Sequence, residues 1–446
     1  MKTKINRRSF LKSGAAVGTG LVILPSGTLF GANAPSNKLN IALIGAYGRA
    51  ISHWDSISSE NIVAICDVNE KNLGIAAERF PKAKQYVDWR KCLDHKGIDA
   101  VVCCTLDHTH AFIGNWAMNR DLHIYLEKPV GCTVHESRVI RAAYLKKKNK
   151  IATQAGTQRH ANPNFSRVRE LIKDGAIGDL RHCYAWGNRQ LRKPGYLPAA
   201  GSPPDGLHYD LWIGPSQMHP YNPEYFSGRP GANCLNWNMY WDFGTGQVGD
   251  MGSHTMDLVW NAIDADLPTS ATAKGDPYNP EVTPVELEMT FTIPANDWRK
   301  EIGVTWSQGG AMPRSPKKYV DLNKIDHGAM FKGTKGYLIA DYDSRVLLPF
   351  GNDADMSYYD RRDKDEITPE AGHFQEEWIN ACKGDLKTSC DFDYNGRMNE
   401  MLMLGLVAYR AGEKLDYNPA KGLVTNNAEA NKYLTRKYRK GWTLDG

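Results

Sequence analysis

Residues 39–50 read LNIALIGAYGRA, a largely apolar run that ends in a glycine-rich turn. Such a run, bounded by a turn, predicts a buried strand that leads into a helix. A dinucleotide-binding turn has the form G-x-G-x-x-G/A here, because glycines allow a tight turn and a close approach to the pyrophosphate. Gly45 and Ala50 fill the first and third places, whereas Tyr47 occupies the second and Gly48 follows it. The stretch therefore predicts a nucleotide-binding turn with one departure.

An acidic residue at a suitable distance supports this interpretation. Asp67 ends the next apolar run, Ile62–Cys66, 22 residues after Gly45. A carboxylate there accepts hydrogen bonds from the ribose 2′-hydroxyl, which favours NAD over NADP. The pyrophosphate would lie at the start of the helix predicted over Arg49–Ile57, where free amides and the helix dipole favour an anion. The alternative is an ordinary strand–helix turn with an Asp at the surface.

Strand-like and helical segments alternate up to residue 157. The apolar runs are 39–44, 62–66, 100–104 and 122–126, and helices are predicted over 49–57, 69–79, 89–93, 111–119 and 133–148. This alternation is typical of βαβ units. We therefore expect an NAD-binding domain over 35–157, an α/β fold with a doubly wound parallel sheet of the Rossmann type.

The pattern changes after residue 158. Residues 187–246 are rich in Pro, Gly, Asn and aromatic residues, which indicates a long loop region. Strand-like runs follow at 286–293, 301–306 and 337–341, and helices are predicted over 372–382 and 394–411. We expect a substrate-binding α+β domain over 158–446, with a mostly antiparallel or mixed open sheet.

The composition is typical of a globular enzyme. The 446 residues are 41% hydrophobic and 24% charged, which allows two or three domains. The formal net charge is +5, but residues 1–34 hold five basic residues and no acidic one. The remainder balances at 50 basic and 50 acidic residues. A neutral remainder favours no nucleic-acid partner and no anionic membrane surface.

Residues 1–34 have the features of a targeting segment. Asn6–Lys12 (NRRSFLK) is a twin-arginine pattern, and a weakly apolar stretch, 14–30, follows it. Ala32–Ala34 has the small-x-small form of a cleavage site, although Pro35 leaves the position of the cut open. We expect export of the folded protein by the twin-arginine route to the periplasm. The alternative is the basic, amphipathic N-terminus of a cytosolic protein. No later stretch is long and apolar enough to predict a membrane span.

The nine cysteines are odd in number and contain no C-x-x-C pair. We therefore expect no zinc site, no other metal and no disulfide framework. One bridge, Cys382–Cys390, is left open because an exported protein can form it.

Two motifs follow apolar runs, at the sheet edge where ligands bind in open α/β sheets. Thr105–His110 (TLDHTH) follows the third run, and Glu127–Pro129 (EKP) follows the fourth. We expect Thr105 and Asp107 of the first motif to line the cofactor or to cap a helix; a metal-binding His-x-His pair is the alternative. A lysine at the tip of a buried strand is costly to desolvate, so Lys128 is expected to have a function. The alternative is a solvated lysine in an ordinary turn.

The glycine-rich turn, Asp67 and the EKP motif together resemble the Gfo/Idh/MocA oxidoreductases, from about residue 37 to the end of the chain. Gly156–Arg159 and Trp237–His254 are similar to the exported, sugar-directed branch of that family. Its members are two-domain NAD(P)-dependent enzymes that act mostly on sugars and polyols, so the resemblance implies such an oxidoreductase. Tyr47 and Leu106 depart from the family pattern, which has Gly and Pro there.

The resemblance also implies roles for individual residues. His254 would take the proton of the substrate hydroxyl, Lys128 would polarise the oxygen, and Asp250 would orient either of them. Helical spacing would place Asp250, His254 and Asp257 on one face; for Asp250 alone, a helix N-cap is the alternative. The residues expected to bind the cofactor are Gly45, Tyr47, Gly48, Arg49, Asp67, Thr105, His108, His110, Glu127, Lys128 and Gln158.

Aromatic and polar residues suggest a sugar site. Trp237 and Trp241 precede the His254 helix, and aromatic faces stack on sugar rings. Side chains expected to contact sugar hydroxyls are Arg159, Asn188, Arg189 and His254. The alternative for the aromatic residues is a place in the core.

Three functions stay open at this point. We favour oxidation of a hydroxyl of a sugar, polyol or glycoside with tightly held NAD, because an exported protein meets little free NAD and would turn over between two sugars. The second is a glycoside hydrolase that uses NAD transiently, and the third is a non-catalytic sugar-binding protein. The resemblance also implies a homo-oligomer.

Overall fold

The computed structural model describes residues 37–187, 189, 191–317, 320–351, 358 and 373–445. The chain divides into two units, Met1–Leu39 and Asn40–Gly446, and both sheets belong to the second. The predicted targeting segment, 1–34, lies outside the described residues. None of the helices in the described part of the chain is long and apolar enough to cross a membrane.

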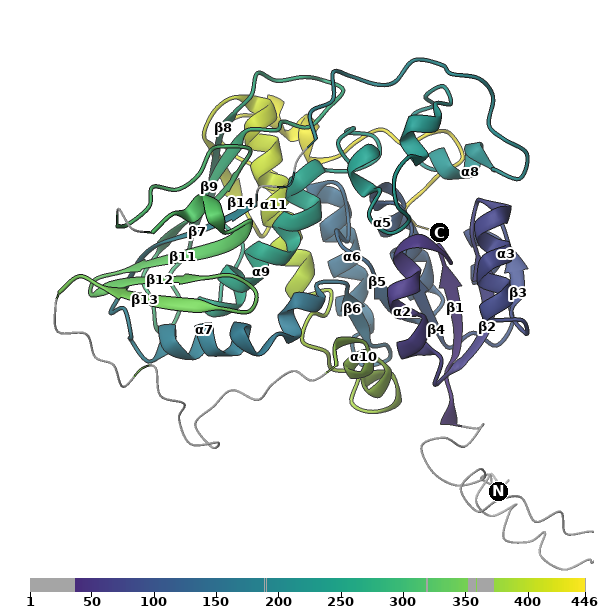
Figure 1. Cartoon of the computed structure of the whole chain (residues 1–446), viewed down its shortest axis with the longest axis horizontal. Coiled ribbons are helices and arrows are strands. Elements are labelled where there is room, and N and C mark those ends of the chain that lie inside the picture. Colours follow the sequence, from purple (N-terminus) through teal and green to yellow (C-terminus); the bar gives the residue numbers. More distant parts are fainter. Residues whose placement is uncertain are drawn as a thin grey trace, which may run out of the picture. The chain divides into compact units, whose positions relative to one another are not determined.

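The first sheet has six parallel strands in the order β3-β2-β1-β4-β5-β6 (Figure 1). Its strands are β1 (Asn40–Ile44), β2 (Asn61–Cys66), β3 (Lys84–Tyr86), β4 (Ala100–Cys103), β5 (His123–Leu126) and β6 (Thr153–Ala155). The register pairs Ile44 with both Cys66 and Cys103, and Cys103 with Leu126. The carboxyl ends of four strands therefore lie at one level, which brings the residues that follow them to one edge.

Helices cover both faces of this sheet, which explains why its central strands are apolar on both sides. On one face lie α4 (Trp89–Leu93), α5 (Asp107–Asn119) and α6 (Val134–Lys147). On the other, Tyr125 of β5 contacts His53 of α2 (Ile51–Ile57) and Trp378 of α10 (Phe374–Lys383). The remaining helix, α3 (Glu70–Arg79), connects β2 to β3.

The second sheet is mixed and has nine strands in the order β13-β12-β11-β7-β10-β9-β8-β14-β15. The pair β7–β10 is parallel, and the other pairs are antiparallel. The strands are β7 (Leu180–Gly187), β8 (Ser270–Gly275), β9 (Leu287–Ile293), β10 (Ile302–Gln308), β11 (His327–Gly333), β12 (Gly336–Ala340), β13 (Arg345–Pro349), β14 (Leu415–Asn418) and β15 (Leu423–Val424). The predicted fold class, a Rossmann sheet with an α+β second part, is confirmed.

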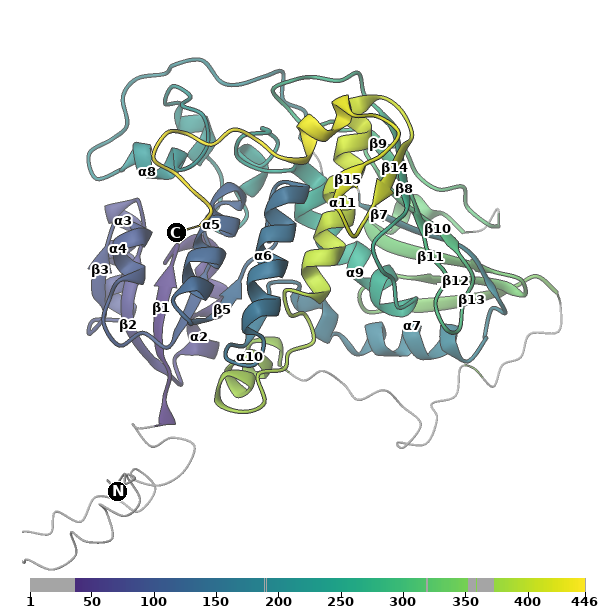
Figure 2. The same cartoon turned by 180° about the vertical axis from the view of Figure 1, so that it is seen from behind.

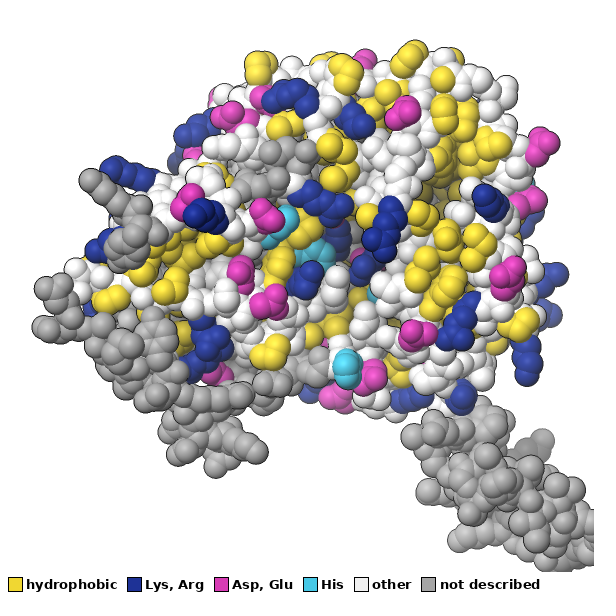
Figure 3. Space-filling model, viewed as in Figure 1, with side chains coloured by type: hydrophobic (Ala, Val, Ile, Leu, Met, Phe, Trp, Pro, Cys, Tyr) yellow, Lys and Arg dark blue, Asp and Glu magenta, His cyan; other side chains and the backbone are white. Residues whose placement is uncertain are grey.

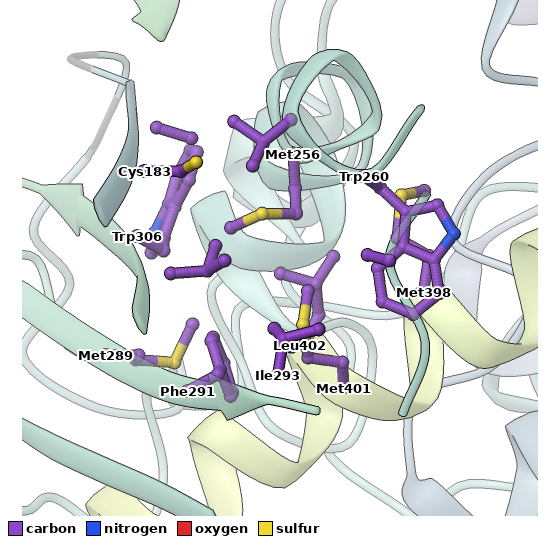
Figure 4. Close-up of a cluster of buried hydrophobic side chains, with 14 of the residues drawn as sticks. Cys183, Met256, Trp260, Met289, Phe291, Ile293, Trp306, Met398, Met401 and Leu402 are labelled. Atoms are coloured by element: carbon purple, nitrogen blue, oxygen red, sulfur yellow. The ribbon is translucent and has the colours of Figure 1, made fainter. Parts of the chain in front are cut away.

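Two helices pack on one face of the second sheet, α9 (Ser253–Ala262) and α11 (Tyr394–Ala411), and α7 (Pro163–Lys173) packs against α9. Met256, Phe291 and Leu402 lie in the core between them (Figure 4). In addition, α11 packs along α6 of the first sheet (Figure 2). This second contact of α11 fixes α9, and the residues at its start, relative to the parallel sheet.

The chain after residue 373 returns to the first sheet. The Ala155 amide donates to the Cys390 carbonyl at 2.9 Å, and the Phe392 amide donates to Thr153 Oγ1 at 3.1 Å. The division of the chain at residue 157 stays a prediction. Cys382 and Cys390 are both free thiols, so the bridge left open between them is not formed.

Candidate functional site

A cavity of about 470 Å³ lies at the carboxyl edge of the parallel sheet and extends to the start of α9. Histidine and basic side chains gather near the middle of this face of the molecule (Figure 3). Of the residues assigned to a site from the sequence, those that line the cavity are Gly45, Tyr47, Gly48, Arg49, Asp67, Thr105, His110, Glu127, Lys128, Gln158, Arg159, Arg189, Trp237, Asp250 and His254.

The glycine-rich turn is held tightly against two neighbouring strands. The Gly45 amide donates to the Cys66 carbonyl at 2.8 Å, and a Cβ at Gly45 would lie only 2.7 Å from the Cys104 carbonyl oxygen. Gly45 also has a φ of 75°, so glycine is required at the first place. Tyr47 directs its ring toward Trp54, with the centroids 6.3 Å apart. Gly48, with a φ of 71°, follows it.

Asp67 lies at the cavity wall directly after β2. Its Oδ1 accepts a hydrogen bond from the Asn69 amide at 3.0 Å. Burial raises the pKa of Asp67 to about 6, against the hydrogen bonds that favour its charged form. A partly desolvated carboxylate at this place is suited to accept hydroxyl donors from a ribose.

Glu127 holds the first basic residue after the turn. Its Oε1 lies 2.9 Å from Arg49 Nε and 2.8 Å from His53 Nε2. Burial alone would raise the pKa of Glu127, but Arg49 and His53 outweigh it and hold that pKa well below its usual range. Glu127 therefore positions Arg49 at the mouth of the turn, where a guanidinium complements a phosphate.

Lys128 and Asp250 form a buried ion pair at the inner end of the cavity, with Nζ and Oδ1 2.6 Å apart. Arg189 Nη1 lies 3.5 Å from the other oxygen of Asp250. Burial opposes both charges, yet their mutual attraction raises the pKa of Lys128 and lowers that of Asp250. The ammonium therefore stays charged and can donate to a substrate oxygen.

His254 completes this group as a neutral imidazole. Among the described residues, its buried Nδ1 has no hydrogen-bond partner. Burial, followed by the charge of Lys128, lowers the pKa of His254 to about 3. A neutral imidazole beside a fixed ammonium can accept a proton, and the imidazolium so formed would lie near the Asp250 carboxylate.

A π-helical turn, Val248–Gly252, precedes α9 and changes the predicted spacing. Asp250 and His254 both reach the cavity, but Asp257 does not share their face. Asp257 instead lies 3.0 Å from His160 Nδ1 and accepts from the Tyr394 hydroxyl at 2.5 Å. The π turn ends before His254, so it changes only the place of Asp250 relative to the other two residues. Asp257 is instead held by its bonds to His160 and Tyr394.

The Asp257–His160 pair also lies beside Cys390, and the three offer ligand atoms within 4.8 Å of one another. The charge of Asp257 raises the pKa of His160 despite its burial. A protonated His160 bonded to Asp257 fits these contacts without a metal ion. The group joins the residues after β6 to α9.

Two predicted site residues lie away from the cavity. His108 is buried, and its ring nitrogens face the carbonyl oxygens of Phe243 and Trp212 at 3.2 and 3.1 Å. Trp241 donates to the Asn279 carbonyl at 3.0 Å and packs against the core of the second sheet. The prediction that His108 binds the cofactor and that Trp241 binds the sugar is therefore corrected. The His108 ring lies between two backbone carbonyl groups, and Trp241 packs in the core, so both side chains support the fold.

Three further residues that were assigned to the site from the sequence are His110, Arg159 and Asn188. His110 lines the cavity, but its ring nitrogens face the carbonyl oxygens of Pro129 and Thr105. Arg159 lies with its guanidinium 5.0 Å from the centre of the Tyr342 ring. Asn188 lies outside the described residues.

The TLDHTH motif, which is expected from the sequence to line the cofactor, also brings Asp107 to the cavity. Asp107 starts α5, is buried, and lines the cavity near Lys128 and Asp250. Burial raises the pKa of Asp107 to about 8, against the opposing charge of Lys128. The TLDHTH motif predicts a place for Asp107 beside the cofactor or at a helix start, but not the burial of its carboxyl group, which depends on tertiary packing.

This shift predicts a pH-dependent stability. The folded pKa of Asp107 lies above its usual value of 3.8, so the folded state holds this proton more tightly and loses stability as the pH rises between about 4 and 8. Asp107→Asn removes that loss. In thermal unfolding, the variant should gain stability over the unaltered protein, and the gain should be larger at pH 8 than at pH 5. An equal difference at both pH values would contradict the assigned shift.

Comparison with known proteins identifies two matching family models. GFO_IDH_MocA, described as an oxidoreductase family with an NAD-binding Rossmann fold, matches residues 39–155. GFO_IDH_MocA_C2, described as the C-terminal alpha/beta domain of an oxidoreductase family, matches residues 183–292. The two matches together make up about half of the chain.

Individual relatives match over part of their length. Inositol 2-dehydrogenase of Salmonella typhimurium is 26% identical over 126 residues, 28% of this chain and 37% of that protein. Levoglucosan dehydrogenase of Pseudarthrobacter phenanthrenivorans is 31% identical over 154 residues, 32% of this chain and 39% of that protein. Alpha-N-acetylgalactosaminidase of Shewanella oneidensis is 27% identical over 222 residues, 42% of this chain and 47% of that protein. Each match spans less than half of the relative.

Solved structures extend the likeness of the fold to most of the chain. The WlbA dehydrogenase from Bordetella pertussis, in complex with NADH and UDP-GlcNAcA, superposes with a TM-score of 0.60 at 15% identity. It covers 85% of this chain and 99% of that one. A levoglucosan dehydrogenase in complex with NADH and levoglucosan gives 0.56 at 16% identity, with coverages of 85% and 99%.

Proposed function

The chain belongs to the Gfo/Idh/MocA oxidoreductase family, and from this premise we propose that it oxidises a hydroxyl-bearing carbon of a sugar, polyol or glycoside with NAD held in the cavity. The observation that carries the proposal is the group at the inner end: a charged Lys128 paired with Asp250, beside a neutral His254 with a free ring nitrogen among the described residues. The curated dehydrogenase relatives act on inositol and levoglucosan by their names, which supports this substrate class.

The residues present fit NAD. The Gly45–Gly48 turn offers a close approach for the pyrophosphate, Arg49 adds a positive charge, and Asp67 can accept the ribose hydroxyls. When bound, NAD supplies the hydride acceptor. Lys128 donates a hydrogen bond to the substrate oxygen and favours its deprotonated form. His254 accepts the hydroxyl proton, and Asp250 keeps Lys128 charged and in place.

Asp67 provides a direct test of this cofactor position. Asp67→Ala should weaken NAD binding by about 10- to 100-fold, the loss expected for one or two hydrogen bonds to a charged acceptor. Titration of nucleotide-free protein with NAD measures this. Glu78→Ala removes an equal charge from the exposed side of α3 and serves as the matched control. Unchanged affinity in Asp67→Ala would show that the ribose is held elsewhere.

A second function is favoured by one specific observation. Of the three relatives described above, the alpha-N-acetylgalactosaminidase covers the largest share of this chain, 42%. A glycosidase of this kind would oxidise the sugar, eliminate the aglycone, add water and reduce the product, so NAD would be regenerated within each turnover. Lys128, Asp250 and His254 could perform the proton transfers of both reactions.

Product analysis separates these functions. The protein is first examined by native mass spectrometry for bound nucleotide, and then incubated with inositols, anhydrosugars, free sugars and aryl glycosides. Ketone formation that depends on NAD supports the dehydrogenase. Release of the aglycone without net NADH contradicts it and supports the hydrolase. Sugar binding without nucleotide binding contradicts both and supports a non-catalytic binding protein.

The setting of this activity is also a proposal. We infer from the twin-arginine pattern in residues 1–34 that the folded protein is exported to the periplasm, where retained NAD would serve two sugar substrates in turn. Cell fractionation tests the location. The homo-oligomer implied by the family resemblance is tested by the mass of the native protein in solution.

A further inference from the structure

We propose that residues 205–237, which we call the cap, lock the nucleotide into the cavity so that it stays bound between turnovers. This inference rests on the proposed function. The cap contains α8 (Tyr209–Ile213) and the short 3-10 turns Pro223–Phe226 and Cys234–Asn236. Both views of the ribbon place α8 beside α3 and α5, at the edge of the parallel sheet that holds the cavity (Figures 1 and 2).

One end of the cap is bonded to the segment that follows Asp67. The Glu70 amide donates to the Gly206 carbonyl at 2.9 Å, and the His208 amide donates to the Val68 carbonyl at 2.9 Å. His208 Nε2 lies 2.8 Å from Glu70 Oε1. The cap thus closes the wall of the cavity beside the carboxylate that we assign to the ribose.

The other end of the cap lies on the glycine-rich turn itself. A Cβ at Gly231 would lie 3.0 Å from the Gly48 carbonyl oxygen, and a Cβ at Gly48 would lie 3.4 Å from the Gly231 nitrogen. Two backbones therefore touch where the pyrophosphate is expected. Both residues have positive φ values, 71° for Gly48 and 79° for Gly231, so each contact depends on glycine.

Between these ends the cap is a packed wall with a hydrophobic cluster of its own. Tyr209, Trp212 and Tyr225 are buried there against Tyr240 and Phe243. The ring of Trp212 lies 4.9 Å from that of Phe243. The cap residues that face the cavity are Leu207, Leu211, Trp212, Tyr225, Phe226, Gly228, Pro230, Gly231, Asn233, Cys234 and Trp237.

The cap covers the cavity at two places, on the glycine-rich turn through Gly231 and on the segment after Asp67 through Gly206 and His208. A nucleotide held beneath these contacts would leave only when they open. The cap also reaches the proposed sugar site, because Cys234 Sγ lies 3.9 Å from Asp250 Oδ2. The cap therefore predicts slow exchange of the nucleotide.

Two alanine substitutions distinguish loss of the Gly231–Gly48 contact from the backbone strain that alanine causes at a positive φ. Gly231→Ala places a methyl against the Gly48 carbonyl, whereas Gly201→Ala imposes the same strain, at a φ of 81°, with nothing within 4 Å. The measurement is the rate at which labelled NAD replaces nucleotide bound to the whole protein. Exchange should be slow in the unaltered protein and in Gly201→Ala, and at least about tenfold faster in Gly231→Ala, since a tenfold change corresponds to a small loss of binding energy.

His208→Ala provides a second variant in case Gly231→Ala does not fold. It removes the hydrogen bond between His208 Nε2 and Glu70 Oε1 and should also speed the exchange. Equal exchange rates in Gly231→Ala and Gly201→Ala, or in His208→Ala and the unaltered protein, would overturn the lock. Rapid exchange in the unaltered protein would overturn it and leave the oxidoreductase standing. Purified proteins that hold no nucleotide and also bind no added NAD would overturn both proposals.

Discussion

Replacing Lys128 with methionine should lower kcat by about 10³-fold, within the range measured for groups that assist proton transfer. The methionine fills a similar volume but cannot donate to the substrate oxygen. Bound NAD should remain, because the turn, Asp67 and the cap are untouched. Steady-state kinetics on a sugar found by the product analysis gives the rate, and native mass spectrometry gives the bound nucleotide.

Lys128→Met leaves the buried carboxylate of Asp250 without its partner, so a control variant is needed. Removing one partner of a buried ion pair is destabilising, here by up to about 3–5 kcal/mol, although Arg189 at 3.5 Å offsets part of this. Lys128→Met with Asp250→Asn keeps the site neutral and should regain stability without regaining activity. Recovery of activity in the double variant would show that Lys128 acts only as a counter-ion.

Replacing His254 with glutamine should lower kcat by about 10²- to 10⁴-fold, the range for loss of a general base. Glutamine keeps a polar group at the position but does not accept a proton in this pH range. His182→Gln, on β7 outside the cavity, serves as the matched control and should keep its activity. An unchanged rate in His254→Gln would refute the assigned role.

The pH profile tests the same residue in the unaltered protein. The active form of His254 is the neutral one, and its pKa is lowered to about 3. With NAD already bound at Asp67, titration of this base should therefore reduce kcat only as the pH falls toward 3, and not between pH 5 and 7. A fall centred near 6.5, the usual value for a histidine, would show that the imidazole is solvated rather than buried beside Lys128.

The elements of the parallel sheet could be predicted where their sequences are apolar. β1, β2, β4 and β5 lie within a residue or two of the expected runs. β3 (KQY) and β6 (TQA) were not predicted, because short strands with polar residues carry no apolar run. Their place at the ends of the sheet follows from long-range pairing, which a local pattern does not contain.

The residues of the candidate site could be predicted where they directly follow strands of the parallel sheet. Gly45, Asp67 and Lys128 follow strands whose carboxyl ends lie at one level, so their assembly follows from the parallel sheet. The start of α9 depends on a π turn and on the packing of α11, and neither has a local signal. His108 and Trp241 were misassigned because the same residue types serve as core residues when tertiary neighbours cover them.

The cap shows the same limit for loops. Its composition, rich in Pro, Gly and aromatic residues, predicted a long loop region, and the structure shows that this region has its own hydrophobic cluster. The contact between Gly231 and Gly48 joins residues far apart in the chain, so no spacing rule could have found it.

A single-turnover experiment tests the central claim most directly. Protein that carries bound NAD is mixed with an excess of the sugar substrate in the absence of free nucleotide, and bound NADH and ketone are measured together. The account predicts that both form in equal amounts and that neither forms in His254→Gln on the same timescale. Ketone without reduction of bound NAD, or free aglycone with no ketone and no lasting NADH, would contradict it.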